Sequence, residues 1–349
     1  MAWSVHSTMD EPLELVLAFV AHYLTAGAAE VHICLDRRRD DVAESLRGQP
    51  QVRLTICDDA YWAQSPAGKR PIGQADRQVM NLRAAYRQSP HDWLLFCDAD
   101  EFLHIPPEGP TLDQILSGCR PDVLFYTFPV AERFYAMGEP PLTIFDGLYR
   151  CRSPRVLETG PAIYGKNWHY LSRALLQDGP GKSIMRTRAG LDVNIHAPKG
   201  NQNVTPADFA PFRGAYLVHY DGLTPFHWAL KLARWYQSMI DLLGDDAQKI
   251  RSRRTSGRAL QAEYLHLHRH DQAALLAMTD LQRLRAVQIA RLAVAGGIAL
   301  IEPRIEATAR AVFPGVDLDF TQAGFDRRLR RQHDRFLDQS GFIYHEQVG

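Results

Sequence analysis

The amino-terminal third of the chain alternates between strand-like and helix-like segments, and this order limits the folds that it can adopt. The strand-like segments are short and rich in apolar or β-branched residues: Trp3–Thr8, Glu30–Leu35, Val52–Cys57 and Trp93–Cys97. The helix-like segments lie between them: Leu13–Ala26, Asp40–Leu46 and Gln74–Arg87. Strands that are joined through helices pair in parallel, so this order predicts an α/β fold with a mostly parallel sheet flanked by helices.

The rest of the chain changes character twice. Its middle part contains further strand-like segments: Val123–Val130, Gly147–Cys151, Lys182–Arg186, Leu191–His196 and Ala215–Tyr220. Its last part is mostly helix-like: Pro225–Leu243, Ala247–Arg269, Asp271–Met278, Asp280–Ala295 and Pro303–Val312. Because 349 residues suggest two domains, we expect an α/β domain over residues 1–240 and a helical C-terminal extension over residues 241–349.

Charge, hydropathy and cysteine usage exclude several classes of protein. The 40 basic and 40 acidic side chains cancel, which argues against a nucleic-acid partner. No apolar stretch reaches the roughly 18–20 residues of a membrane span, and Met1–Glu11 lacks the pattern of a signal peptide. The five cysteines are widely spaced without a C-x-x-C pair, as in proteins of a reducing compartment. We expect a cytoplasmic protein, with peripheral contact at the inner face of a membrane left open.

Three carboxylates, Asp98, Asp100 and Glu101, come directly after the apolar segment Trp93–Cys97. Ligands of parallel α/β sheets bind at the carboxyl ends of the strands. Clustered carboxylates need a compensating cation, and oxygen ligands suit Mg²⁺ or Mn²⁺. Such an ion can neutralise a departing diphosphate. A short D-x-D pattern also occurs in solvated turns, but its place after a buried strand favours a metal site.

Four blocks in order resemble glycosyltransferases of the family 2-like group with the GT-A fold. WLLFCDADEFL (93–103) resembles the metal-binding signature of that group, W-hydrophobic-D-x-D-E-F. Three further segments resemble other blocks of the group. Residues 5–36 resemble its opening, and residues 181–198 (GKSIMRTRAGLDVNIHAP) resemble its K-S-I…H-x-P block. Residues 217–235 (LVHYDGLTPFHWALKLARW) resemble its H-Y…F…K block. The chain departs from the group at Asp10, where the group has Asn, and after Asp36, where three arginines replace its D-N-x-S-x-D pattern.

The resemblance covers residues 1–240 and implies a GT-A, Rossmann-like domain. It also implies metal-dependent transfer of a sugar from a nucleoside-diphosphate-sugar, expected to be UDP-linked, to a hydroxyl of a glycan, lipid or small molecule. Polysaccharide biosynthesis and inversion at the sugar are the corresponding expectations.

Roles for single residues follow from the resemblance. Thr8 and Glu11 would border the nucleotide, and Asp36 would face its base or ribose. Lys182 would pair with phosphate, unless it is a solvated surface lysine. The loop Trp62–Ile72 would close over the donor, unless it is an ordinary surface connector.

Asp98 and Asp100 would hold the metal and the ribose-diphosphate, with Asp100 as the firmer metal ligand. A histidine after a late strand would complete the metal shell, and His196 and His219 are the two candidates. An imidazole is a suitable ligand beside two carboxylates.

An inverting transferase needs a base that deprotonates the acceptor hydroxyl. Glu132 is the expected base and Asp146 the alternative, although either one can be a surface carboxylate. Glu101 can orient the site or cap the next turn, and Gln78 and Asn81 lie one helical turn apart, facing either the site or solvent.

A basic run, Lys249, Arg251, Arg253, Arg254 and Arg258, can touch anionic lipid or the nucleotide, but a solvated helix face is the usual role of such a run.

Two other functions remain open. A nucleotidyltransferase acting on sugar phosphates would carry a Gly-rich basic loop after its first strand, but residues 8–14 (TMDEPLE) contain neither Gly nor Lys. A non-catalytic carbohydrate-binding protein that retains the fold would tolerate loss of the second aspartate, but Asp100 is present.

Overall fold

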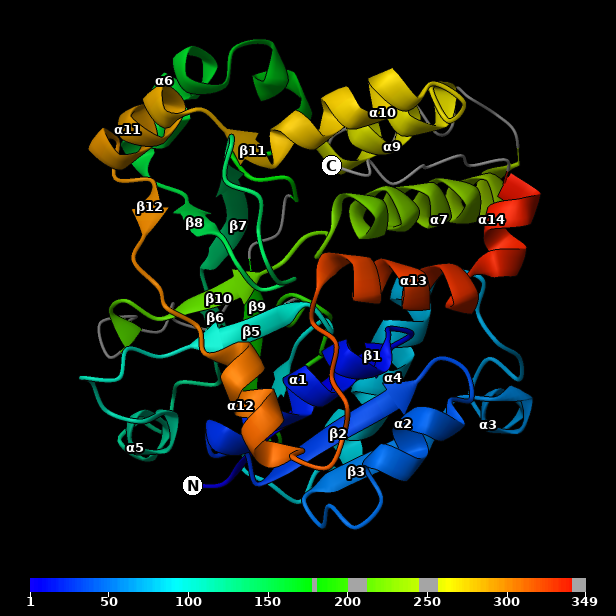
Figure 1. Cartoon of the computed structure of the whole chain (residues 1–349). Helices are drawn as coiled ribbons and strands as arrows, with labels where there is room; N and C mark the ends of the chain where they lie inside the picture. The colour runs from blue at the N-terminus through cyan, green and yellow to red at the C-terminus, as the bar shows by residue number, and fades with distance from the viewer. Residues whose placement is uncertain (178–180, 200–211, 245–256, 341–349) are drawn as a thin grey trace. The chain divides into compact units, whose positions relative to one another are not determined.

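The structure is a computed structural model that describes residues 1–177, 181–199, 212–244 and 257–340 (Figure 1). The chain divides into two compact units. Unit 1 comprises Met1–Val130, Gly179–Val218 and Pro303–Leu318, and unit 2 comprises Ala131–Asp178, His219–Glu302 and Asp319–Gly349. Each unit therefore draws on separate parts of the sequence. The expected end of a catalytic domain at residue 240 stays a prediction.

Unit 1 is built on a six-stranded sheet in the order β3-β2-β1-β4-β9-β6. Four neighbouring strands are parallel: β1 (Trp3–Met9), β2 (Glu30–Leu35), β3 (Val52–Ile56) and β4 (Trp93–Phe96). The strand β9 (Lys182–Arg186) pairs antiparallel with β4 and with β6 (Phe125–Phe128). The mostly parallel sheet of the predicted α/β fold is confirmed.

Helices cover both faces of this sheet (Figure 1). On one face, Leu82, Ala85 and Tyr86 of α4 (Gln74–Gln88) pack against Leu94 and Phe96. On the other face, α1 (Leu13–Thr25) brings Tyr23 to Trp3, with ring centroids 6.4 Å apart. The remaining elements of unit 1 are short: α2 (Asp40–Ser45), α3 (Asp59–Ala63), β5 (Glu101–His104), α5 (Leu112–Ser117) and α12 (Ile305–Val312). The central strand β1 is buried along its whole length, as a strand covered on both faces must be.

Unit 2 combines a small sheet with helices. In it, β8 (Leu148–Cys151) pairs antiparallel with β7 (Val130–Ala136) and with β12 (Ile298–Ala299), while β11 (Arg283–Leu284) pairs parallel with β7. Its helices are α6 (Pro154–Tyr164), α7 (Pro225–Leu243), α9 (Gly257–Leu267), α10 (Gln272–Met278), α11 (Ala286–Val294), α13 (Gln322–Gln332) and α14 (Asp334–Ser340). The chain passes from unit 1 to unit 2 within β10 (Tyr216–His219).

Three expected elements differ from the structure. Leu191–His196 is not a strand, because only Asp192 makes an isolated bridge, to Lys199. The expected helix Asp280–Ala295 is interrupted by β11, whose pairing with β7 overrides local helix propensity. The expected loop Trp62–Ile72 begins later than predicted, because Trp62 belongs to the short helix α3. Of the expected helix Ala247–Arg269, residues 247–256 lie outside the described residues.

The surface gives two further findings. In the described parts of the chain, no helix is both long enough and apolar enough to cross a membrane.

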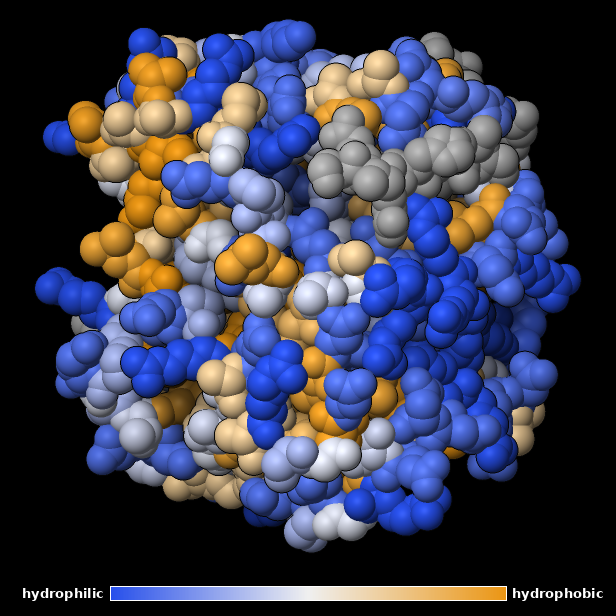
Figure 2. Space-filling view, viewed as in Figure 1, coloured by the Kyte–Doolittle hydropathy of each residue, from blue (hydrophilic) through white to orange (hydrophobic). Residues whose placement is uncertain are grey.

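Figure 2 shows apolar side chains gathered over α11 and β12 of unit 2. Val294 and Leu300, at the ends of these elements, are 80% and 95% exposed.

Candidate functional site

The acidic residues of unit 1 form a tight turn at the carboxyl end of β4. The strand Trp93–Phe96 is buried throughout, and the backbone N–H of Glu101 donates to the carbonyl of Asp98 at 3.1 Å. Glu101 Oε2 in turn accepts from the backbone N–H of Asp98 at 2.8 Å. Asp100, within this turn, is 5% exposed. The turn thus presents carboxylates at the end of a central strand, where ligands of such sheets bind.

Asp98 is held by two side chains from other elements. Gln78 of α4 donates through Nε2 to Asp98 Oδ1 at 2.7 Å, and Lys182 of β9 donates through Nζ to Asp98 Oδ2 at 2.7 Å. Lys182 Nζ also lies 3.6 Å from Glu101 Oε2. Gln78 therefore faces the acidic turn and not solvent.

Lys182 is a buried cation, with 2% of its side chain exposed. Burial opposes its charge, but the attraction of Asp98 and Glu101 outweighs burial, so the pKa of Lys182 lies above its ordinary value. The residue before it has to be glycine: Gly181 has a φ of +95°, and a Cβ there would collide with the carbonyl oxygen of Phe128. Burial excludes the surface-lysine alternative, while the contact with phosphate stays a prediction.

His196 lies beside the start of β9. Its Nδ1 is 3.1 Å from the carbonyl oxygen of Gly181, and its own carbonyl accepts from Ser183 Oγ at 2.6 Å. A carbonyl only accepts, so Nδ1 carries a hydrogen, and in the neutral ring the lone pair is on Nε2. Histidines that bind metals through Nε2 commonly use Nδ1 in this way. His196 therefore contacts Gly181, the residue directly before the lysine that holds Asp98.

The carboxylate of Asp36, at the end of β2, is enclosed by two arginines. It accepts from Arg77 Nε at 2.8 Å and from Arg70 Nη2 at 2.7 Å, and it is 7% exposed. Arg77 Nη1 also donates to the carbonyls of Pro71 and Ile72, at 2.9 and 2.7 Å. Asp36 and Arg77 therefore anchor one end of the loop Trp62–Ile72 to α4. Sequence reasoning missed both arginines.

Thr8 and Glu11 differ in their surroundings. Thr8 Oγ1 accepts from Asn81 Nδ2 at 3.1 Å, and Asn81 Oδ1 accepts from Tyr61 at 2.7 Å. Asn81 is therefore an internal link between α3, α4 and β1. Glu11 follows β1 and is partly exposed, and its carbonyl accepts from Arg39 at 2.9 Å. The nucleotide contacts of Thr8 and Glu11 stay predictions.

In unit 2, Glu132 is a fully buried counter-ion. Its Oε1 accepts from Arg150 Nε and Nη2 at 3.0 and 2.6 Å, and the backbone N–H of Leu176 lies 2.9 and 3.0 Å from its two oxygens. A general base must reach the hydroxyl that it deprotonates, whereas this carboxylate faces an arginine and backbone amides. Its structural role is clear from these contacts, and its role as base stays a prediction.

Asp146, the alternative base, accepts through Oδ2 from the backbone N–H groups of Leu142 and Thr143, each at 2.8 Å. The carboxylate therefore caps the turn that precedes it, as short acidic side chains commonly do. Its role as base also stays a prediction.

His219 and Asp221 are buried at the end of β10. His219 Nδ1 lies 4.0 Å from Glu132 Oε2. Asp221 accepts from Arg258 Nη1 at 2.9 Å and from Lys231 Nζ at 3.2 Å. Burial opposes the charge of Asp221, but Arg258 and Lys231 outweigh it, so its pKa lies well below the ordinary value. Sequence reasoning missed Asp221, two residues after a candidate ligand, and the members of the basic run before Arg258 lie outside the described residues.

Unit 1 contains a second set of side chains with metal-binding chemistry, His6, His32 and Cys34, whose ligand atoms lie within 4.8 Å of one another. His32 Nδ1 is 2.9 Å from Arg53 Nη2 and 3.2 Å from His6 Nδ1, and His32 Nε2 is 2.9 Å from Thr55 Oγ1. Since arginine can only donate, His32 Nδ1 accepts and Nε2 carries the hydrogen. Both ring nitrogens of His32 are engaged, and Arg53 would repel a cation, so this set fits a neutral polar network better than a metal site.

The chain was compared with known proteins. No protein-family model matches it, and no curated protein does. HddC from Yersinia pseudotuberculosis is similar to 54% of this chain, over 78% of its own length, with 9% identity and a TM-score of 0.30. The galactosyltransferase LgtC, solved with donor and acceptor sugar analogs, is similar to 53% of this chain, over 58% of its own length, with 12% identity and a TM-score of 0.25. An active-site mutant of LgtC is similar to 55% of this chain, over 60% of its own length, with 12% identity and a TM-score of 0.25. The chain thus spans less than two thirds of LgtC, and likenesses of this size carry no conclusion about activity.

Proposed function

We propose that this chain is a metal-dependent glycosyltransferase. It transfers a sugar from a nucleoside-diphosphate-sugar, expected to be UDP-linked, to a hydroxyl of a glycan, lipid or small molecule. The observation that carries the proposal is the acidic turn after β4: Asp98 and Asp100 lie at the carboxyl end of a buried strand, and Gln78 and Lys182 fix the orientation of Asp98. A site for an anionic donor in a chain without net charge has to depend on such local groups.

The proposed metal is Mn²⁺ or Mg²⁺, held by Asp98 and Asp100 with one imidazole, from His196 or from His219. Carboxylate oxygens and imidazole nitrogens are suitable donors for these ions. Each oxygen of Asp98 accepts one hydrogen bond, from Gln78 and from Lys182, and Asp100 is the proposed firmer ligand. The ion supplies charge neutralisation for the departing diphosphate.

The side chains around the turn have supporting roles in this proposal. Lys182 compensates the negative charges of Asp98 and Glu101, which lie close together. Asp36 and Arg77 hold the loop Trp62–Ile72 near the end of β2, where parallel sheets bind nucleotides. Arg70, whose side chain is 43% exposed, is the proposed contact for the donor's anionic groups.

The decisive experiment is a panel of nucleotide-sugars assayed for hydrolysis and transfer with Mn²⁺, with the Asp100→Ala variant in parallel. We expect turnover of a UDP-sugar that falls at least about a hundredfold in the variant, with the unfolding midpoint unchanged. Asp122→Ala is the matched control, because Asp122 is exposed and pairs with the exposed Arg120. Full activity of Asp100→Ala would exclude the metal assignment.

Two further assays on the purified protein distinguish the two other functions. Release of pyrophosphate from a nucleoside triphosphate and a sugar phosphate would identify a nucleotidyltransferase. Binding of glycans, with no thermal stabilisation by UDP or GDP in the presence of Mn²⁺, would identify a non-catalytic binding protein.

A further inference from the structure

A cavity of about 670 Å³ in unit 2 is lined by more cations than carboxylates. Its volume lies in the range of small-molecule sites. Four basic side chains line it, Lys166, Arg283, Arg285 and Arg291, against the single carboxylate of Asp280. These charges favour an anionic ligand.

Most of this positive charge is uncompensated. Asp280 Oδ1 accepts from Arg283 Nη2 at 3.2 Å, but among the described residues no carboxylate pairs with Lys166, Arg285 or Arg291. Arg283 Nη2 also donates to Thr279 Oγ1 at 2.6 Å. Its Nε is buried and has no hydrogen-bond partner in the described part of the chain, although buried donors are normally satisfied.

The wall of the cavity is preformed. Two side chains of α11 donate to carbonyls of α6: Gln288 Nε2 to Ile163 at 2.9 Å, and Arg291 Nη1 to Ala162 at 3.0 Å. Gln288 Oε1 also accepts from the backbone N–H of Arg285 at 3.0 Å. These bonds fix the segments that carry Arg285 and Arg291, so less ordering is needed when a ligand binds.

Aromatic rings complete the lining, from Tyr164, Tyr170 and Tyr264. Tyr170 and Tyr264 meet edge to face, with centroids 5.8 Å apart. The C–H face of a sugar ring packs well on such rings, whereas a bare inorganic anion gains nothing from them. Cations and aromatic rings together favour a sugar that bears an acidic group.

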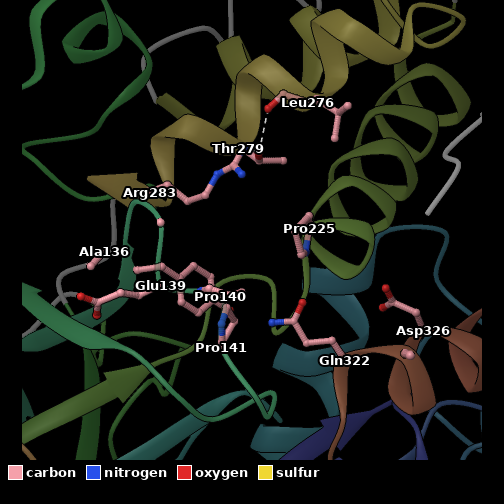
Figure 3. A pocket seen from close by; sticks show the side chains of 13 residues that line it. Ala136, Glu139, Pro140, Pro141, Pro225, Leu276, Thr279, Arg283, Gln322 and Asp326 are labelled. Carbon is pink, nitrogen blue, oxygen red and sulfur yellow. Dashed lines mark hydrogen bonds between the residues drawn. The ribbon is translucent and has the colours of Figure 1, made fainter. Parts of the chain in front are cut away.

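A second cavity, of about 500 Å³, also has Arg283 in its lining. Figure 3 shows Arg283 reaching into it from β11 and Gln322 reaching into it from α13. Gln322 Nε2 is buried without a hydrogen-bond partner among the described residues. This cavity also offers the hydroxyl of Thr279 and the carboxylate of Glu139, which suit neutral sugar hydroxyls.

We propose that these two cavities bind an acidic glycan. A phosphate or carboxylate on one sugar lies among Lys166, Arg285 and Arg291, and the neighbouring neutral sugar contacts Gln322. Arg283, which lines both cavities, lies between the two sugars. The binding itself is independent of the transferase activity. That this glycan is the acceptor rests on the proposed function.

The test is calorimetric titration of the purified chain with four ligands: glucose, glucuronic acid, glucose 1-phosphate and inorganic phosphate. We expect glucuronic acid and glucose 1-phosphate to bind roughly tenfold or more tightly than both glucose and inorganic phosphate. Equal affinities for inorganic phosphate and glucose 1-phosphate would overturn the sugar site. Equal affinities for glucose and glucuronic acid would overturn the role of the cations.

Variants separate the two cavities. Lys166→Gln with Arg285→Gln removes the preference for acidic ligands, and Arg155→Gln, an exposed residue of α6 outside both cavities, keeps it. Gln322→Ala weakens a glucuronate-containing disaccharide but not glucuronic acid alone. A parallel titration with UDP and Mn²⁺ keeps the proposals distinct: UDP binding without acidic-glycan binding overturns this inference only, and the reverse result overturns only the donor assignment.

Discussion

Lys182 Nζ lies 2.7 Å from Asp98 Oδ2, although the two residues are 84 positions apart in the sequence. The contact exists because β9 pairs antiparallel with β4, which brings a residue of the G-K-S block to the D-x-D turn. Two blocks of the sequence resemblance thus meet in one ion pair, and the pair links the stability of unit 1 to the orientation of Asp98.

Lys182→Met is expected to destabilise the protein, because Asp98 and Glu101 lose their shared cation. Loss of one partner of a fully buried pair costs about 3–5 kcal/mol. Because the side chain of Asp98 is 29% exposed, we expect a loss at or below the lower end of this range, measured as the free energy of unfolding in urea. The double variant Asp98→Asn with Lys182→Met is expected to recover part of this loss. Lys69→Met, at an exposed position of the loop, is the control. Equal stability of Lys182→Met and Lys69→Met would show that the ion pair is not formed.

Glu132→Gln distinguishes a structural carboxylate from a catalytic base. If Glu132 mainly holds Arg150, the variant loses about 3–5 kcal/mol of stability. Replacing both partners, with Glu132→Gln and Arg150→Met, should restore part of it, since both charges are then removed. A variant that unfolds at the wild-type urea concentration but transfers sugar more than about a hundredfold more slowly would instead identify the base.

Arg77→Met is expected to release the loop Trp62–Ile72. The variant removes the hydrogen bonds of Arg77 to Asp36, Pro71 and Ile72, so amide hydrogens of the loop should exchange about tenfold or more faster than in the wild type. Arg87→Met, on the exposed side of the same helix, should leave exchange unchanged. If the loop closes over the donor, Arg77→Met also raises KM for the nucleotide-sugar. Unchanged loop exchange would contradict the anchoring role.

The order of elements in unit 1 could be predicted because local patterns and tertiary contacts agree there. The strand β4 is buried on both faces, so its sequence is apolar throughout. The bounds of β9 and α7 also agree with the expected Lys182–Arg186 and Pro225–Leu243. For α7 the local signal is the proline in its first turn.

Elements and charge partners that depend on contacts between distant segments could not be predicted from local sequence. The pairing of β11 with β7 leaves no trace in residues 280–295 themselves, so their pattern predicts one continuous helix. Partners of charged residues were also missed, because Arg77 and Asp36 are 41 positions apart and the sequence contains many other arginines. The acidic turn could be recognised from its own residues, but the groups that hold Asp98 could only be identified in the structure.

Buried histidines make the stability of unit 1 depend on pH. Burial, and for His32 the nearby Arg53, lowers the pKa of His32 to about 3, and burial lowers the pKa of His22 to about 4. The pKa of His6 is lowered as well, by burial and by its neighbours His32 and Arg53. In the unfolded chain each titrates near 6.5, so below that pH the unfolded state binds more protons. Stability is therefore fully present above about pH 6.5 and falls as the pH drops toward 4, by up to about 1.4 kcal/mol per unit for each histidine.

Urea unfolding at pH 7.5, 6.5, 5.5 and 4.5 measures this dependence. His32→Gln should flatten the curve between pH 6.5 and 4.5, because one buried group that resists protonation is removed. The matched control is His91→Gln, which replaces a histidine that is only half-buried and should leave the slope unchanged. If the dependence of stability on pH in His32→Gln were as steep as in the wild type, His32 would have to be protonated already in the folded protein. That result would contradict the hydrogen bond from Arg53 to His32 Nδ1.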